Sequence, residues 1–209
     1  MVETTRGRRI KGLDADQRRA RRQDDLLAAA LELFASAGYP NTSIEQICQA
    51  AYVGTKGFYE IFDSKEACYL ALLRQVSATI EARMVEASRH VPDDESEAGR
   101  VLLAAFAHAL VDDPRVAKVT FGQAGGISLA VERQRRENRR WAADFLTSVW
   151  QRHNAAVDPR AYRVAIGVIG GLFDLVADWM LDTDPADPGG REALLADLTT
   201  FYQAVRRGL

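Results

Sequence analysis

The sequence predicts an all-α protein of about nine helices. Apolar residues recur at the helical spacing of three to four positions along almost the whole chain. No segment combines alternating apolar and polar residues with flanking turn residues, which is the pattern of strands and hairpins. The 209 residues, 47% hydrophobic and 27% charged, suffice for two small domains and are too apolar for a disordered chain.

Composition narrows the class of protein further. The two cysteines, Cys48 and Cys68, provide neither a disulfide framework nor a zinc site. The most apolar run, residues 164–173, has ten residues and is followed at once by Asp174 and Asp178, so we expect no membrane span. The chain opens on arginines rather than on an apolar stretch. We therefore expect no secretory signal and a cytoplasmic protein.

Basic residues concentrate at the N-terminal end. Residues 1–22 carry a net charge of about +5, so the rest of the chain carries about −7. This distribution indicates a polyanionic partner at one end of the molecule, although a solvated tail that maintains solubility is the alternative. We predict a basic arm over residues 1–19. Within it, Arg8, Arg9 and Lys11 are expected to follow a DNA minor groove.

The first two predicted helices differ in length. Apolar residues up to Phe34 share one face of a long helix, and Gly38 ends it because glycine commonly supplies the left-handed C-cap. Thr42 and Glu45 match a capping box, with Thr42 as the N-cap and Glu45 reaching back to its backbone. The helix that this box opens is short and extends to about Ala51.

A tight turn and a second short helix come next. Residues 52–54 supply the turn, and the helix extends over residues 55–62. Asp63 or Ser64 then caps a long helix that ends before Pro92. Two short helices joined by a tight turn and braced by a longer helix describe a helix-turn-helix, whose second helix enters the major groove of DNA. Helical bundles without any DNA function contain the same geometry, so these patterns favour a DNA reader without requiring one.

The residues expected at the DNA surface are small, polar or basic. Thr55 and Lys56 are expected nearest the bases, and Tyr59 lies one turn further on, where its phenol can reach a phosphate. Lys65 begins the next helix, so its ammonium and that helix's unpaired amides could hold the same backbone. The complete predicted DNA-binding set is Thr42, Ser43, Gly54, Thr55, Lys56, Gly57, Tyr59 and Lys65.

Three stretches of this region carry a family resemblance. Residues 31–39 (LELFASAGY), 42–47 (TSIEQI) and 57–66 (GFYEIFDSKE) resemble the N-terminal domain of TetR-family transcriptional regulators. The resemblance implies a DNA-binding domain over residues 20–80, followed by a ligand-binding and dimerisation domain over residues 81–209. It also implies a homodimeric repressor that a small molecule releases from its operator.

This chain departs from the family pattern at the turn and in the second short helix. The family's turn is usually Gly-Val-Ser, whereas residues 52–54 are Tyr-Val-Gly. Gly57 replaces a common Thr and weakens the helix by up to about 1 kcal/mol relative to alanine. Glu60 and Ile61 stand where the family often has His or Tyr. The fold and docking mode are expected to survive these changes, but the bases that are read do not carry over.

Residues 81–209 are predicted to contain only helices. Asp158-Pro159 and Asp187-Pro188 each read as an N-cap followed by a proline in the first turn. The predicted helices cover residues 96–111, 114–123, 127–154, 159–181 and 188–207.

Two functions are assigned within this second domain. Small residues of the predicted helix 159–181 and apolar residues of the predicted helix 188–207 are expected to form a dimer seam, with burial inside one subunit as the alternative. Most aromatic residues are expected in the core, and some of them around a ligand cavity. The predicted dimer residues are Gly167, Gly170, Gly171, Leu194, Leu198 and Phe201, and the predicted cavity residues are Phe106, Phe121, Trp141, Phe145 and Phe173.

The sequence therefore favours a DNA-binding transcriptional regulator whose partners are an operator duplex, a second copy and a small-molecule effector. The long helix that begins at Lys65 is expected to be the one element that touches both sites. The alternatives are a TetR-like activator, or a helical ligand-binding or interaction protein that has lost DNA binding. An enzyme is not expected, because we find no nucleophile–base pair, phosphate loop or Glu-x-x-His pattern. No cofactor or metal is expected, since the three histidines match no ligand spacing.

Overall fold

The computed structural model describes residues 14–121, 127–153, 160–184 and 187–208, and within these ranges it contains nine helices and no strand. This arrangement confirms the all-α class predicted from the periodicity. The helices are α1 (Ala15–Ala37), α2 (Ile44–Ala50), α3 (Thr55–Tyr59), α4 (Lys65–Ser88), α5 (Glu95–Val111), α6 (Pro114–Phe121), α7 (Leu129–His153), α8 (Ala161–Asp182) and α9 (Pro188–Arg206).

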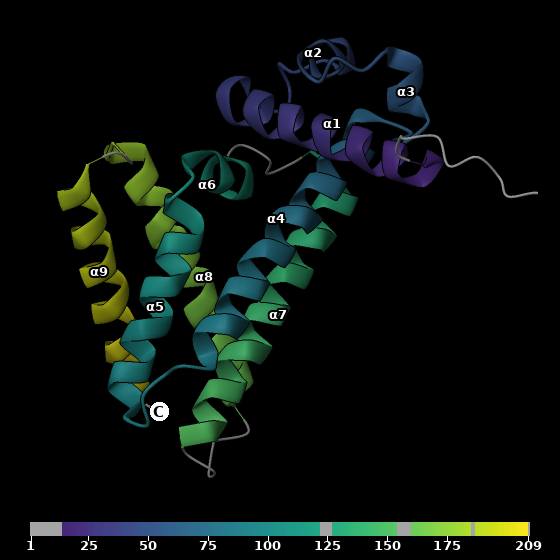
Figure 1. Cartoon of the computed structure of the whole chain (residues 1–209). Helices are drawn as coiled ribbons and strands as arrows, with labels where there is room; N and C mark the ends of the chain where they lie inside the picture. Colours follow the sequence, from purple (N-terminus) through teal and green to yellow (C-terminus); the bar gives the residue numbers. More distant parts are fainter. Residues whose placement is uncertain (1–13, 122–126, 154–159, 185–186, 209) are drawn as a thin grey trace, which may run out of the picture.

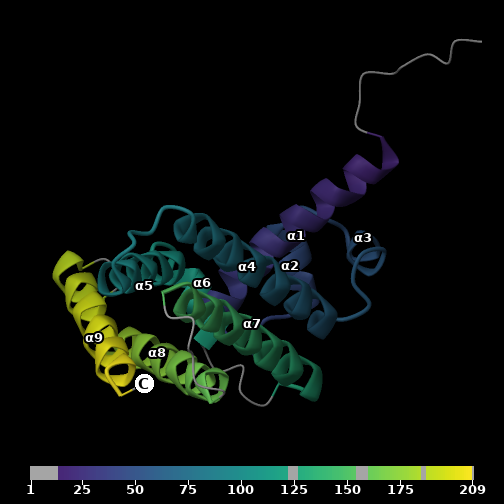
Figure 2. The same ribbon diagram turned by 90° about the horizontal axis from the view of Figure 1, so that it is seen from below.

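The helices form two groups that meet at α6. Helices α1 to α3 gather at one end of the molecule, and α4 and α7 extend away from them side by side (Figures 1 and 2). Helices α5, α8 and α9 complete a bundle around α4 and α7, while α6 contacts both α1 and α5. The chain thus forms a small three-helix head on a larger helical body.

Two hydrophobic cores underlie these groups. The core of the head is built mainly from α1 to α4, but it also buries Val119 of α6 and Val131 of α7. The core of the body joins α4, α5, α7, α8 and α9. A boundary drawn at residue 80 therefore divides the sequence but not the packing, because α6 and α7 complete the core of the head.

Helix α1 begins earlier than the sequence suggests. Asp14 caps it by accepting from the backbone N–H of Gln17, and the Gln17 side chain accepts from the Asp14 backbone in return. Residues 15–19, assigned to the basic arm, are therefore helical. The remainder of that arm, with Arg8, Arg9 and Lys11, lies outside the described residues.

The capping box of α2 lies one residue later than predicted. Ser43 is the N-cap, with its Oγ accepting from the Gln46 N–H at 3.2 Å and Gln46 Oε1 accepting from the Ser43 N–H at 2.7 Å. Thr42 does not cap α2, because its buried hydroxyl donates to the Gly38 carbonyl at the end of α1. The predicted roles of Thr42 and Glu45 in this box were wrong for that reason.

The apolar part of helix α8 extends beyond its central run. The helix spans 22 residues and contains an 18-residue window with a mean hydropathy of 1.8, so by length and composition alone it could cross a membrane. It packs instead along α7 and α9 inside the helical body. Its predicted cap at Asp158-Pro159 lies outside the described residues, whereas the Asp187 cap of α9 is confirmed, accepting from the N–H groups of Gly189 and Gly190.

Candidate DNA-binding surface and ligand cavity

Helix α3 presents a polar and aromatic face to solvent. Phe58 is fully buried and packs against the tilted ring of Phe62. These contacts fix the inner side of α3 on the core of the head. The opposite side of the helix and its preceding turn carry exposed residues. We refer to these as the recognition face, and they are Tyr52, Gly54, Thr55, Lys56 and Tyr59.

Gly57 is explained by packing rather than by DNA contact. A Cβ atom on Gly57 would lie 2.9 Å from Val53 Cγ1 and 3.5 Å from a guanidinium nitrogen of Arg22. Only glycine allows this approach without movement of its neighbours. The same Arg22 pairs with Glu60 at 2.9 Å, and this half-exposed ion pair connects α1 to the end of α3. The helix-propensity cost of Gly57 is therefore offset by the close approach of Val53 from the preceding turn.

Lys65 has structural partners inside the head. Its Nζ donates to the carbonyl oxygens of Tyr39 at 2.8 Å and Thr42 at 2.7 Å. The same ammonium lies 4.4 Å from the centroid of the Tyr39 ring. Lys65 thus holds the connection between α1 and α2 and has one remaining N–H to offer a phosphate.

The other predicted contacts are divided between surface and interior. Thr55, Lys56 and Tyr59 are exposed on the recognition face. Ser43 is half-buried and already accepts a hydrogen bond at the start of α2. Thr42 is only 2% exposed and bonds internally, so its side chain is unavailable to DNA and its place in the predicted set is corrected.

Tyr52 belongs to the recognition face and was missed by the sequence analysis, which assigned it only to the turn. It is the one residue other than glycine with a positive φ, +55°, among the described residues. Its side chain is 98% exposed, so no packing compensates the strain of that conformation. The sequence did contain a signal for this residue, because the turn of the TetR family usually has glycine where this chain has the bulky Tyr52.

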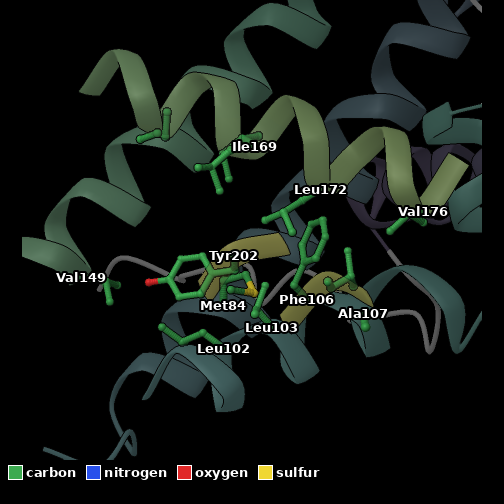
Figure 3. Close-up of a cluster of buried hydrophobic side chains, with 14 of the residues drawn as sticks. Met84, Leu102, Leu103, Phe106, Ala107, Val149, Ile169, Leu172, Val176 and Tyr202 are labelled. Carbon is green, nitrogen blue, oxygen red and sulfur yellow. The ribbon is translucent and has the colours of Figure 1, made fainter. Parts of the chain in front are cut away.

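The body contains a cavity of about 190 Å³ that is lined by residues of all six helices from α4 to α9. All five aromatic residues predicted to line a cavity do line this one: Phe106, Phe121, Trp141, Phe145 and Phe173. Phe106 and Phe173 stack at 5.7 Å between ring centroids, and Trp141 and Phe145 stack at 5.4 Å. Figure 3 shows Phe106 and Tyr202 together with aliphatic side chains from α4, α5 and α8 in the surrounding core. The lining is therefore largely apolar and aromatic.

A few polar side chains interrupt this lining. Asn138 donates to Ser77 Oγ at 2.6 Å, and Arg135 donates to the Thr120 carbonyl at 2.8 Å. The Tyr202 hydroxyl accepts from Trp150 Nε1 at 2.9 Å, and burial raises the pKa of this phenol. Glu81 also lines the cavity, and burial raises the pKa of its carboxyl group. Most polar groups of the lining are thus satisfied within the chain.

Helix α6 connects the cavity to the head. Its last residues, Thr120 and Phe121, line the cavity. On its other side, the Val119 carbonyl accepts from the buried Tyr69 hydroxyl at 3.0 Å. At its start, Arg115 pairs with Glu32 of α1 at 3.1 Å. Helix α4 is therefore not the only connection between the cavity and the head, because α6 contacts α1 as well.

The predicted dimer residues fall into two groups. Leu194 and Leu198 are buried in the chain's own core, and a Cβ atom on Gly171 would lie 2.5 Å from Phe201 Cζ. Leu194 and Leu198 are thus covered within one chain, which corrects their assignment to a partner, whereas Gly171 and Phe201 pack against each other and remain half-buried. Gly167 and Gly170 have open space above their Cα atoms and lie on the outward side of α8.

Comparison with known proteins agrees with this arrangement of a helix-turn-helix head on a helical body. Residues 26–72 match the model of the family described as "Bacterial regulatory proteins, tetR family". The regulator RutR of Escherichia coli K12 is 37% identical over 75 residues, which are 36% of this chain and 32% of RutR. The chain thus matches about a third of the length of that relative. The activator FasR of Mycolicibacterium smegmatis is 25% identical over 180 residues, covering 86% of this chain and 80% of FasR.

Solved structures share the whole fold. The fatty acid degradation regulator FadR from Bacillus halodurans superposes with a TM-score of 0.70 at 18% identity, covering 88% of this chain and 94% of that one. FadR from Bacillus subtilis, solved in complex with stearoyl-CoA, gives 0.68 at 20% identity, covering 85% and 98%. Residues 26–72 of the head match the TetR-family model, in agreement with the resemblance seen in residues 31–66.

Proposed function

We propose that this chain is a homodimeric, DNA-binding transcriptional regulator of the cytoplasm that leaves its operator when a small molecule occupies the cavity of the body. One observation carries the proposal. The recognition face lies on a TetR-family head, and α4 and α6 of that same chain connect the head to a hollow, aromatic cavity. DNA reading and ligand binding thus have separate sites joined by continuous packing.

The recognition face supports a specific docking mode. Helix α3 would enter the major groove with Thr55 and Lys56 nearest the base edges, where a lysine can bond to guanine. Tyr59 and Tyr52 flank these residues and would contact the sugar–phosphate backbone, which sets register without reading sequence. The exposed Lys56 and Thr55 argue against the alternative of a head that has lost DNA binding.

The proposed switch acts through α4 and α6. Two recognition helices of a symmetric dimer occupy successive major grooves only when they are about 34–36 Å apart. A molecule in the cavity would displace Phe121 on α6 or the cavity-facing side chains of α4, and either helix would then tilt the head. Thermodynamic reciprocity requires bound DNA to weaken ligand binding by the same factor, typically about 1–3 kcal/mol.

The outward side of α8 is the proposed dimer surface. Ile166 is 41% exposed there, next to Gly167 and Gly170, whose missing side chains leave room for the close approach of a second helix. Through the two-fold axis, the same surface of the partner would cover it. The interface proposed here therefore excludes Leu194 and Leu198, which the chain itself covers.

Repression is the proposed direction of control, with activation as the second candidate because FasR is named an activator. The effector is proposed to be smaller than the stearoyl-CoA bound by the Bacillus subtilis neighbour. A cavity of about 190 Å³ lies below the range of roughly 300–1,000 Å³ common for drug-sized ligands.

A gel-shift titration with the DNA upstream of the protein's own gene tests the proposal, with a random-sequence duplex of the same length as control. We expect the upstream DNA to bind at least 10³-fold more tightly than the random duplex, with affinity falling as salt rises. Lys56→Ala should relax the preference for one base position and keep the fold. Equal, weak binding of both duplexes at physiological salt would contradict DNA-specific regulation and favour a ligand-binding protein.

A further inference from the structure

The pairing of α4 with α7 defines the levels of the cavity at which its polar side chains lie. These helices run side by side from the head, with Arg74 bonded to Gln134 and Asn138 bonded to Ser77. Each partner on α7 thus lies about 60 positions after its partner on α4. Continued by one turn, the same pairing places Glu81 at the level of Trp141, and both residues line the cavity.

The two arginines of the lining have interactions other than with Glu81. Arg135 donates to the Thr120 carbonyl of α6, and the guanidinium of Arg139 lies 5.9 Å from the centroid of the Phe173 ring. Arg135 lies at the level of Arg74, seven residues before Glu81 on α4, which is roughly 10 Å along the helix axis. By the same pairing Arg139 lies within one turn of Glu81, but it forms no ion pair with Glu81, and no basic side chain of the described residues lowers the pKa of that carboxyl group.

The region of the cavity around Glu81 combines a carboxylate with aromatic rings. Glu81 is only partly exposed, and within the described part of the chain it accepts no hydrogen bond and forms no ion pair. Burial raises the pKa of its carboxyl group, and no basic side chain of the described residues lowers it. Trp141, at the same level, stacks with Phe145 one turn further along α7, at an interplanar angle of 14°. A negative charge beside aromatic faces is the arrangement that attracts organic cations.

The volume of the cavity limits the size of such a cation. An apolar cavity of about 150 Å³ is enough to bind benzene, and this one measures about 190 Å³. The space therefore fits one aromatic ring with a short substituent. A ring would be covered by aromatic and aliphatic side chains on all the helices from α4 to α9 that line the cavity.

We propose that the cavity binds a small aromatic amine in its protonated form, with the ring against the Trp141–Phe145 pair and the ammonium group on the Glu81 carboxylate. The ammonium supplies the donor and the charge that Glu81 lacks within the chain. This inference names the effector class for the proposed regulator and so rests on the proposed function.

Three probes of equal size test the charge preference: benzylamine, benzyl alcohol and benzoate, each titrated into the full-length dimer by calorimetry at pH 7. We expect benzylamine to bind at least tenfold more tightly than the alcohol and more tightly still than benzoate. Tighter binding of benzoate would overturn the proposal and assign the site to the arginines. Equal affinities of the three probes would also overturn it, because the cavity would then select by size alone.

Two variants locate the charge that matters. Glu81→Gln should lower benzylamine affinity at least tenfold and leave benzyl alcohol within twofold. Asp174→Asn is the matched control, because Asp174 also lines the cavity but is exposed on α8. It should change benzylamine affinity less than threefold. Equal losses in the two variants would contradict a specific contact with Glu81 and indicate a general negative potential.

A separate readout keeps this inference distinct from the proposed function. The affinity of the same preparation for the upstream DNA is measured with and without saturating benzylamine. Tight, Glu81-dependent binding of benzylamine without any change in DNA affinity would support the site and contradict the switch. If benzylamine releases the DNA but its affinity is unchanged by Glu81→Gln, the result would support the switch and contradict the proposed amine site.

Discussion

Lys65 in the head and Glu81 in the body are both half-buried charged residues on α4, but only Lys65 has hydrogen-bond partners among the described residues. The ammonium of Lys65 donates to two carbonyl oxygens and lies against the Tyr39 ring. The carboxylate of Glu81 lines a cavity and has no partner among the described residues. One helix thus carries a satisfied charge at its beginning and an unsatisfied one about four turns later.

The head and the body differ in the same way in how their cores are packed and where their proposed sites lie. The head has a filled core that extends to Val119 and Val131, and its proposed function lies on the outside, at the recognition face. The body leaves space inside its core, and its proposed function lies in that space. A surface that reads DNA needs rigid support, whereas a cavity that senses a ligand needs groups whose interactions are completed only on binding.

The largest expected effect comes from removing the satisfied charge. Lys65→Met retains the apolar stem but leaves the carbonyl oxygens of Tyr39 and Thr42 without their charged donor. We expect the free energy of unfolding of the head to fall by about 2–3 kcal/mol, measured by urea unfolding. The control is Lys56→Met, whose side chain is exposed and should change stability by less than about 0.5 kcal/mol while weakening DNA binding.

An unchanged urea midpoint for Lys65→Met would show that the hydrogen bonds of Lys65 do not stabilise the head, and so would contradict the difference drawn between Lys65 and Glu81. The DNA titration then decides the remaining role of Lys65. If its third N–H also reaches a phosphate, a folded Lys65→Arg variant should keep the salt slope of binding, whereas Lys65→Met should reduce it by about 1.

Paired glycine variants test the division between internal and external packing of α8. Gly171→Ala forces a methyl group into the Phe201 ring, so we expect a loss of about 1–3 kcal/mol in the free energy of unfolding. Gly170→Ala meets open space and should gain about 0.5–1 kcal/mol in a chain kept monomeric by dilution. If Gly170 lies in the dimer surface, the same methyl group should weaken dimerisation in analytical ultracentrifugation. Equal effects of the two variants on unfolding would contradict the assignment of their faces.

Tyr52→Gly separates stability from function within the head. Glycine relieves the positive φ, and the 98% exposed side chain has no packing to lose, so we expect a gain of about 0.5–1 kcal/mol. DNA affinity should fall at the same time, because Tyr52 is part of the recognition face. Tyr52→Phe keeps the strain and removes only the hydroxyl group, which identifies whether the phenol or the ring makes the contact. Unchanged DNA affinity of Tyr52→Gly would reduce Tyr52 to a turn residue.

The smallest effect concerns the unsatisfied charge and its dependence on pH. Because burial raises the folded-state pKa of Glu81, the folded protein holds this proton more tightly than the unfolded chain does. The contribution of Glu81 to stability therefore declines as pH rises from the unfolded pKa, about 4.3, through the higher folded value. Glu81→Gln should be slightly more stable than the parent protein at pH 7 and equal to it below about pH 4. Thermal unfolding at the two pH values, without added amine, measures the difference, and a less stable variant at pH 7 would indicate a hidden partner of Glu81.

Periodicity and capping patterns located most helices because these signals are local. The Asp187-Pro188 cap, the ends of α5 and the start of α4 followed from residues within one or two turns of each other. The capping box of α2 was misplaced by one residue because Thr42 bonds to the Gly38 carbonyl, a tertiary use of its hydroxyl that a local pattern does not contain.

The sequence by itself determined the helical class and the resemblance of the head to the TetR family, since spacing and motif are properties of the chain alone. It supplied candidate aromatic residues for a cavity, but the packing of the helices decided which of them line it. Only the tertiary structure decided that Gly171 and Phe201 pack together, that α6 joins the cavity to the head, and that Lys65 is satisfied while Glu81 is not. Those facts depend on which segments meet across 23 residues or more of chain, as in the bond from Lys65 to Thr42. Contacts at that separation are fixed by the packing of whole helices, and no local pattern encodes them.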